Sequence, residues 1–329
     1  MPDSTGARNM PRVQSEFRPA WWLRGAHAQT LWPTLFRRGP RIALEWERVS
    51  LPDGDFIDLC WHGPRDGPMV LFLHGLEGSI HSHYARGILR ELGRRGFRAC
   101  LMHFRGCSGE PNWLPIAYHS GKTDDPLWLI HHLHERGEVF GAVGVSLGGN
   151  VLLKLLGELG EAVPLRRAAV MSVPFVLDHA ARRLRQGLSR LYERHLIGHL
   201  QRSFERKFAR LSCPLSVEVR RLRSFHAFDD QVTAPLHGFA GVDDYYQQAS
   251  SRQFIPKIRI PTLILHALDD PFMFPHTAPD AEELPECVRL EIAPRGGHMG
   301  FVTGRWPWRA DYWGERRLAS WIAGEVHPP

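Results

Sequence analysis

Short runs of consecutive apolar residues recur along this chain and alternate with longer segments of helical periodicity. Strands buried inside a parallel sheet have the first pattern, and helices that cover a sheet have the second. Between residues 81 and 96, for example, Tyr84, Ile88 and Leu92 lie on one helical face and Gly96 is a stop signal. The alternation predicts an α/β protein with a mostly parallel sheet that is covered by helices on both faces.

The expected sheet has roughly eight strands. Strands are predicted at residues 69–76, 97–104, 139–145, 166–175, 260–268 and 288–293, and helices at 81–96, at 124–137, directly after 145 and around 318–322. Residues 41–61 contain two more β-prone segments on either side of "PDGD", a turn signal. They predict an antiparallel hairpin at one edge of the sheet.

One long segment, residues 178–254, interrupts this order with a helical pattern. An apolar stripe recurs every four residues within it, at Tyr192, Leu196, Leu200, Phe204 and Phe208. Residues 178–210 are also basic, with nine Arg and Lys against three acids. Two interpretations stay open: a solvated basic helix packed over the core, or a lid. A lid would cover a substrate pocket with its apolar side and make weak contact with a membrane surface through its basic side.

The predicted organisation is one α/β core, residues 17–177 and 255–329, with a helical lid or cap insertion at 178–254. Residues 1–16 are polar and contain Gly and Pro, so we expect this segment to be disordered.

Composition excludes several classes of protein. The net charge of +6 comes from 37 Arg and only 4 Lys. Codon usage in a GC-rich genome explains this excess of Arg over Lys better than a nucleic-acid site does. No nucleic-acid partner is therefore expected. The five cysteines lack a C-x-x-C pair, the N-terminus lacks a secretory apolar stretch, and no apolar run could span a membrane. We expect a cytoplasmic protein with no transmembrane segment; the sequence does not indicate its oligomeric state.

The strongest candidate for chemistry is Ser146 in "GAVGVSLGGN", residues 141–150. A G-x-S-x-G match alone is weak, because a chain of this composition contains one by chance about 0.15 times. Its context is stronger, since an apolar strand precedes Ser146 and a helical pattern follows it. This is the order of a nucleophile elbow, in which Gly144 and Gly148 allow strand and helix to pass closely.

A serine nucleophile needs a base and an acid that orients the base. His298 lies in the glycine-rich loop "APRGGHMGF" after the last predicted strand, and Asp269 and Asp270 follow the strand before it. We favour Asp270 because such turns place the acid three residues after the small residue that ends the strand, here Ala267. The order Ser146, Asp270, His298 is typical of α/β-hydrolases.

Two backbone N–H groups are candidates for an oxyanion hole. Leu147 begins the helix after Ser146, and Leu76 lies in the loop "HGLEGS" after an earlier strand. Five residues near these loops are candidates for the pocket wall: His74, Gly75, Phe104, Arg105 and Met299.

No metal and no cofactor are expected. His195 and His199 have the i, i+4 spacing of helical zinc ligands, but a third ligand is missing. The chain contains neither a P-loop nor G-x-G-x-x-G.

The chain resembles the YheT-like branch of the α/β-hydrolase superfamily, which is related to abhydrolase-domain esterases and lipases. The resemblance extends over residues 17–325 and rests on "WLRGAHAQTLWP", "HGLEGS", "HFRGCSGEPN", "YHSGKTDD" and "FDDQVTAPLHGF". It implies that Ser146, Asp270 and His298 are nucleophile, acid and base, that the oxyanion hole lies near Leu76 and Leu147, and that a carboxylic ester is hydrolysed without a cofactor.

The apolar stripe favours an apolar acyl group, so the function expected first is a serine esterase for short- to medium-chain esters. A lipase for monoacylglycerol or phospholipid is the alternative. A peptidase or thioesterase would keep the same three residues, and a catalytically silent binding scaffold is the alternative outside enzymes.

Overall fold

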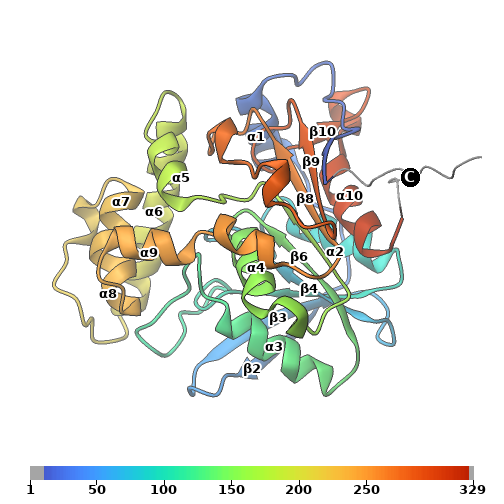
Figure 1. Ribbon diagram of the computed structural model, residues 1–329. Helices are drawn as coiled ribbons and strands as arrows, with labels where there is room; N and C mark the ends of the chain where they lie inside the picture. Colours follow the sequence, from blue (N-terminus) through green and yellow to red (C-terminus); the bar gives the residue numbers. More distant parts are fainter. Residues whose placement is uncertain (1–10, 326–329) are drawn as a thin grey trace, which may run out of the picture.

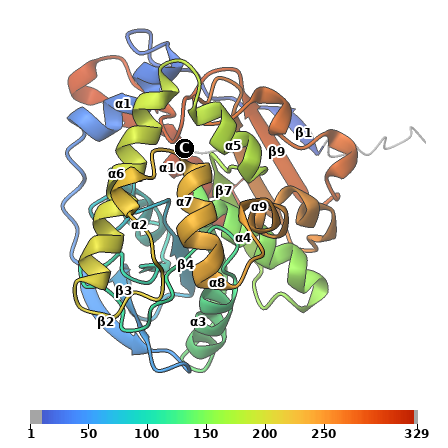
Figure 2. The same cartoon turned by 90° about the vertical axis from the view of Figure 1, so that its left-hand side faces the viewer.

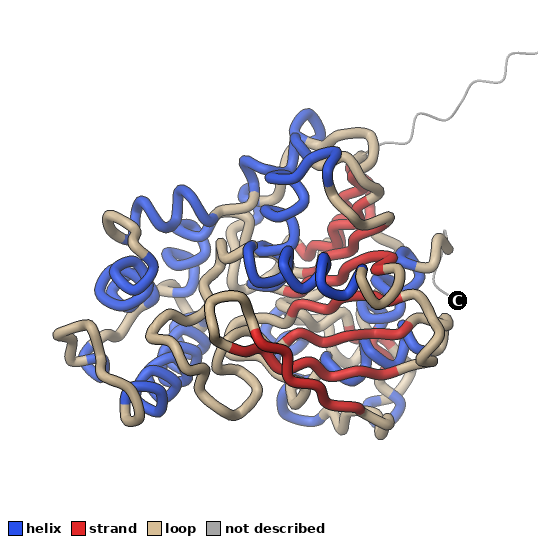
Figure 3. Tube along the Cα trace, turned by 90° about the horizontal axis from the view of Figure 1, so that it is seen from below, coloured by secondary structure: helices blue, strands red, loops and turns tan. Residues whose placement is uncertain are grey.

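The computed structural model describes residues 11–325 and confirms the α/β fold (Figure 1). Nine strands form one sheet (Figure 3), in the order β1 (Arg12–Gln14), β9 (Val288–Ala293), β8 (Thr262–Ala267), β7 (Arg167–Met171), β6 (Val139–Val145), β4 (Met69–Leu73), β5 (Arg98–Met102), β3 (Phe56–His62) and β2 (Glu45–Ser50). Neighbouring strands are parallel from β1 to β5, whereas β3 is antiparallel to both β5 and β2. The predicted hairpin is therefore the β2–β3 edge.

Helices cover both faces because the apolar residues of each strand alternate between them. On β4, Val70 and Phe72 belong to one apolar cluster and Leu71 and Leu73 to the other. The first cluster includes helices α2 (Ala85–Gly93) and α10 (Trp313–Ile322), and the second includes α3 (Asp124–His134) and α4 (Leu147–Leu159). Because both faces of the sheet are covered by helices, the strands are nearly continuous apolar runs.

The expectation of disorder over residues 1–16 is wrong for the described part of that segment. Residues 12–14 form β1, which pairs in parallel with β9, and the N–H of Leu290 donates to the carbonyl of Pro11 at 2.7 Å. Polar side chains gave no strand signal here, but the backbone of any residue can complete the edge of a sheet. Residues 1–10 lie outside the described residues. This strand also raises the count from the expected eight or so to nine.

The segment between β7 and β8 folds into helices outside the sheet (Figure 2). It contains α5 (Leu177–Leu184), α6 (Ser189–Phe208), α7 (Phe225–Phe228), the π-helical turn η3 (Asp229–Thr233), α8 (Ala234–His237) and α9 (Val242–Ala249). We refer to α5–α9 as the helical insertion. Its buried residues form two small apolar clusters of their own. Within residues 11–325, no helix has the length and apolar character needed to cross a membrane.

Candidate active site

Ser146 lies in the tight turn between β6 and α4. Its backbone has φ 50° and ψ −121°, which is unfavourable for a residue with a side chain. A Cβ at Gly148 would lie 2.4 Å from the carbonyl oxygens of Leu73 and His74, and one at Gly144 would lie 2.6 Å from the Gly148 carbonyl oxygen. Only glycine fits at both positions, so the two glycines allow β4, β6 and α4 to approach closely enough to form the turn.

The structure brings Ser146, His298 and Asp270 together at the carboxyl ends of the strands. His298 Nε2 lies 3.1 Å from Ser146 Oγ, and His298 Nδ1 lies 2.9 Å from Asp270 Oδ2. The Asp270 side chain is buried, and its other oxygen accepts the N–H of Phe272 at 2.8 Å. The Phe272 ring is stacked on the His298 imidazole at 3.9 Å. One face of the imidazole is therefore covered, while both of its nitrogens have partners.

Asp269 makes different hydrogen bonds from Asp270. One of its carboxylate oxygens accepts the N–H groups of Gly296 and Gly297, at 2.8 and 2.9 Å. Asp269 therefore holds the loop that carries His298, while Asp270 contacts the imidazole itself. Burial raises the pKa of Asp269, and the two backbone N–H groups act in the opposite direction.

Helix α1 (Ala26–Phe36) supports the same loop from the N-terminal part of the chain. The Thr30 hydroxyl accepts the N–H of His298 at 2.9 Å, and the Gln29 side chain exchanges hydrogen bonds with the backbone of Val302 at 2.7 and 2.9 Å. A Cβ at Gly297 would lie 2.5 Å from the Ala26 carbonyl oxygen. The Gln29–Thr30 segment of the motif "WLRGAHAQTLWP" positions the histidine loop. No local sequence pattern predicts such a contact.

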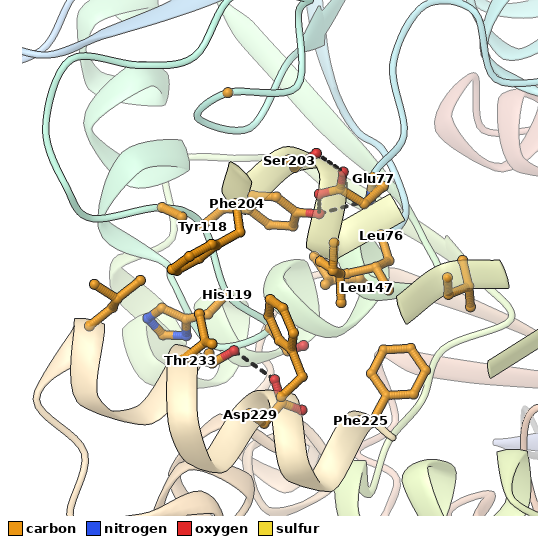
Figure 4. A pocket seen from close by; sticks show the side chains of 18 of the residues that line it. Leu76, Glu77, Tyr118, His119, Leu147, Ser203, Phe204, Phe225, Asp229 and Thr233 are labelled. Carbon is orange, nitrogen blue, oxygen red and sulfur yellow. Dashed lines mark hydrogen bonds between the residues drawn. The ribbon is translucent and has the colours of Figure 1, made fainter. Parts of the chain in front are cut away.

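The two candidate oxyanion donors belong to one wall of the cavity around Ser146. Leu76 and Leu147, both labelled in Figure 4, line the cavity. Ser146 and His298 line the same cavity. The loop of Leu76 is fixed on both sides, because the N–H of Gly75 donates to the Tyr84 hydroxyl at 2.9 Å and that of Glu77 to the Tyr118 hydroxyl at 2.7 Å.

Of the five predicted pocket-wall residues, Arg105 lines the cavity, and His74, Gly75, Phe104 and Met299 do not. His74 points into the protein, where Nδ1 contacts the Gly75 carbonyl at 2.7 Å and Nε2 accepts the Phe104 N–H at 3.0 Å. Burial lowers the pKa of His74 to about 3, so this imidazole is neutral. Met299 is buried, and its N–H donates to Ser172. The prediction failed because proximity along the chain does not determine the direction of a side chain.

The cavity extends from Ser146 to the helical insertion and encloses about 1350 Å³, its open mouth included. Much of its wall is apolar. The stripe of α6 contributes Leu196, Leu200, Phe204 and Phe208 to this wall, and α5, α7 and η3 add Leu177, Leu184, Phe225, Phe228 and Val232. Of the two interpretations of this segment, the contacts favour a cover over the cavity.

The polar groups of the wall include two carboxylates, Glu77 and Asp229 (Figure 4). The Glu77 carboxylate accepts the Tyr118 hydroxyl at 2.8 Å and the hydroxyl of Ser203, which belongs to α6. Glu77 thus joins the Leu76 loop to the insertion. Glu77 also has a positive φ of 51°.

The second carboxylate, Asp229, is the first residue of η3. Its carboxylate accepts the hydroxyls of Thr233 and Tyr246, at 2.7 and 2.8 Å. Enclosure in the cavity wall raises the pKa of Asp229 to about 6, although both hydroxyls favour the ionised form. No sequence pattern singled out Glu77 or Asp229 as a site residue. The structural signal at Asp229 is a π-helical turn beside a cavity.

The described residues contain no group of three or more His, Cys, Asp and Glu arranged to hold a metal ion. His195 and His199 are neighbours on α6, with ring centroids 4.5 Å apart.

Comparison with known proteins places the chain in a family. The sequence model of the alpha/beta hydrolase fold family matches residues 68–305, and the chain belongs to this family. It is 40% identical over 320 residues to a protein of Escherichia coli (strain K12) named "Putative esterase YheT", with 94% of this chain and 93% of that protein covered. It is 30% identical to the mouse protein "Phospholipase ABHD3" over 317 residues, which cover 92% of this chain and 77% of that protein. Among solved structures, a Pyrococcus furiosus esterase has the same fold, with a TM-score of 0.53, 15% identity and coverage of 88% of this chain and 99% of that one.

Proposed function

We propose that this protein is a serine hydrolase that cleaves carboxylic esters through a Ser146–His298–Asp270 triad and an acyl-enzyme. The observation that carries the proposal is the hydrogen-bonded series Ser146 Oγ, His298 Nε2, His298 Nδ1 and Asp270 Oδ2, with contacts of 3.1 and 2.9 Å. This is the geometry that a nucleophile, a base and an orienting acid require. Membership of the α/β-hydrolase fold family, whose relatives named above include proteins called esterase and phospholipase, supports it.

In the proposed mechanism, His298 takes the hydroxyl proton of Ser146 as Oγ attacks the ester carbonyl carbon. Asp270 holds the imidazole through Nδ1 and stabilises the imidazolium that forms. The N–H groups of Leu76 and Leu147 stabilise the negative charge on the carbonyl oxygen. His298 then gives the proton to the leaving alcohol, which leaves the acyl group on Ser146. Water, activated by the same imidazole, releases the acid.

The apolar wall of the cavity suggests where the acyl group binds. Leu200, Phe204 and Phe228 line a space whose exposed surface is mostly apolar. We therefore infer an apolar acyl group, and short- to medium-chain esters are the first substrates to test. The relative named phospholipase favours a second candidate, a lipase for monoacylglycerol or phospholipid.

Ser146→Ala tests the proposal. The variant should lose at least about a thousandfold in kcat on p-nitrophenyl butyrate, because the covalent step needs the hydroxyl. It should also lose labelling by a fluorophosphonate probe. Circular dichroism and thermal unfolding would serve as the folding control. A wild-type protein that the probe does not label, or an alanine variant with full activity, would contradict the proposal and favour a binding scaffold.

The substrate class is tested separately, with p-nitrophenyl acetate, butyrate and octanoate beside a monoacylglycerol and a phospholipid. A kcat/KM that peaks at butyrate or octanoate supports the esterase. Higher values for the two lipids support the lipase.

A further inference from the structure

Large apolar side chains are exposed mainly on three segments of this protein. Within the described part of the chain, ten Leu, Phe and Trp side chains are well exposed, and only Trp46 and Trp113 lie elsewhere. The other eight are Trp21, Leu31, Leu35, Phe36, Leu188, Leu191, Trp306 and Trp308. Trp308 and Trp21 are 77% and 58% exposed, which is unusual for the largest aromatic side chain.

The segments around Trp21 and Trp306 are in direct contact. Trp21 Nε1–H donates to the carbonyl of Arg305 at 3.0 Å, and Trp22 Nε1–H donates to that of Gly304 at 3.1 Å. The Trp21 and Trp306 rings are 6.4 Å apart, and the Trp306 and Trp308 rings are parallel at 5.5 Å. Three tryptophans therefore form one exposed group.

The third segment, the start of α6, adjoins α1. His27 Nδ1 lies 3.0 Å from the Tyr192 hydroxyl, and the two rings are stacked at 5.7 Å. Leu31 and Leu35 follow His27 at intervals of four residues on α1. Leu188, the residue before α6, and Leu191 in its first turn both precede Tyr192. Figure 2 shows α1 beside the upper part of α6. We refer to residues 18–38, 188–194 and 305–309 as the Trp–Arg face.

The charge of this face has one sign. Residues 18–38 and 305–309 contain no acidic residue, and exposed arginines in them are Arg18, Arg24, Arg38, Arg305 and Arg309. Arg190 and Arg194 are exposed on α6, whereas Glu193 between them is buried and accepts the N–H of Phe225. The exposed charged side chains of these three segments are therefore all cationic.

We propose that the Trp–Arg face binds the surface of a lipid bilayer that contains anionic phospholipid. Tryptophan favours the boundary between head groups and hydrocarbon, leucine and phenylalanine insert just below it, and arginine pairs with phosphate. The charge decides against a symmetric dimer through this face, because two copies of a cationic face repel each other. The face differs from the expected contact through the basic side of the lid, since most of its residues lie outside the helical insertion.

The position of the face connects it to the cavity. The Tyr192 ring contacts Phe272 at 5.1 Å, and Phe272 is stacked on His298. A bilayer bound here would lie next to the site of Ser146. This step rests on the proposed function and implies that the substrate enters from the lipid phase.

Vesicle sedimentation of the full chain tests the proposal. The wild-type protein should bind vesicles of equal parts phosphatidylglycerol and phosphatidylcholine at least about tenfold more strongly than vesicles of phosphatidylcholine alone, and added salt should weaken the binding. Trp306→Ala combined with Trp308→Ala, and separately Arg305→Glu combined with Arg309→Glu, should each reduce binding about tenfold or more.

Matched controls are available on the opposite side of the molecule. Trp46, 53% exposed, belongs to β2, which Figure 1 places far from α1, and the Arg65 side chain is 82% exposed. Trp46→Ala and Arg65→Glu should leave binding within about twofold. Equal losses in these controls, binding that ignores lipid charge, or no binding at all would overturn the proposal. So would a dimer in sedimentation velocity that the tryptophan variants dissociate.

The result is independent of the proposed function. Ser146→Ala should bind vesicles like the wild-type protein, and the four surface variants should hydrolyse p-nitrophenyl acetate at the wild-type rate. A protein that binds vesicles but has no esterase activity would contradict only the proposed function.

Discussion

Two adjacent carboxylates, Asp269 and Asp270, have separate tasks at the site. Asp270 contacts the imidazole of His298, whereas Asp269 accepts two backbone N–H groups of the loop that carries it. In the proposed mechanism, one carboxylate stabilises charge during the reaction and the other fixes geometry before it. Their effects on activity and on stability should therefore differ.

Asp270→Asn should lower kcat on p-nitrophenyl butyrate by about a thousandfold or more, because the amide no longer stabilises the imidazolium. Asp269→Ala should lower kcat much less and cost about 1–3 kcal/mol in the free energy of unfolding, since the N–H groups of Gly296 and Gly297 lose their acceptor. Steady-state kinetics and urea unfolding measure the two effects. A larger kcat loss for Asp269→Ala than for Asp270→Asn would reverse the assignment.

Asp229 should make the stability depend on pH. Its folded pKa of about 6 lies above the ordinary value of 3.8, so the ionised form destabilises the fold at pH 7 and this penalty disappears as the pH falls below both values. Asp229→Asn removes the penalty but keeps a side chain that can bind Tyr246 and Thr233. The variant should gain about 1–2 kcal/mol relative to the wild-type protein at pH 7, and less at pH 4.5. Urea unfolding at both pH values measures this; a pH-independent difference would contradict it.

At the scale of elements, one side of helix α6 covers the cavity and its other side is exposed to solvent. The apolar stripe of α6 lines the cavity with Leu196, Leu200, Phe204 and Phe208, whereas His195 on the same helix is exposed. The stripe residues are four positions apart, which places them on one side of the helix. Under the proposed function, the size of these side chains would limit the length of the acyl chain that the cavity accepts.

Leu200→Trp should fill part of the cavity and select against long acyl chains. We expect kcat/KM for p-nitrophenyl octanoate to fall about tenfold or more, which corresponds to about 1.4 kcal/mol or more of lost transition-state binding, while the value for the acetate changes little. His195→Trp adds the same ring on the exposed side of α6 and should leave the ratio of octanoate to acetate unchanged. An unchanged ratio in Leu200→Trp would show that the acyl group binds elsewhere.

At the scale of the whole molecule, segments from the N-terminal part of the described chain support the site from a great distance in sequence. Thr30 of α1 holds the backbone of His298, 268 positions away in sequence, and β1 completes the sheet beside β9, the strand before the His298 loop. The N-terminal segment is therefore part of the scaffold that aligns the imidazole with Ser146.

Thr30→Val keeps the shape of the side chain and leaves the N–H of His298 without its acceptor. We expect kcat to fall about tenfold with little change in KM, because a misplaced base slows chemistry more than binding. Thr34→Val, at an exposed position on the same helix, is the control and should have wild-type kinetics. Equal kinetics for the two variants would show that α1 does not position the base.

Local patterns were enough to predict much of the fold. Apolar runs predicted the central parallel strands, the "PDGD" turn predicted the β2–β3 hairpin, and the stripe beginning at Tyr192 predicted α6. These features have a period or a turn within a short window, and burial of one face makes that period visible in sequence. The spacing from Ala267 also favoured the carboxylate that contacts His298.

The direction of individual side chains and the contacts between distant segments depended on the tertiary structure. The sequence by itself determined the order of strands and helices and the candidates Ser146, Asp270 and His298, because each follows a recognisable local element. Only the folded chain decided that His74 points inward, that Thr30 meets His298, and that residues 12–14 pair with β9. Such contacts join positions whose spacing in sequence has no physical meaning, since the packing of the whole chain brings them together.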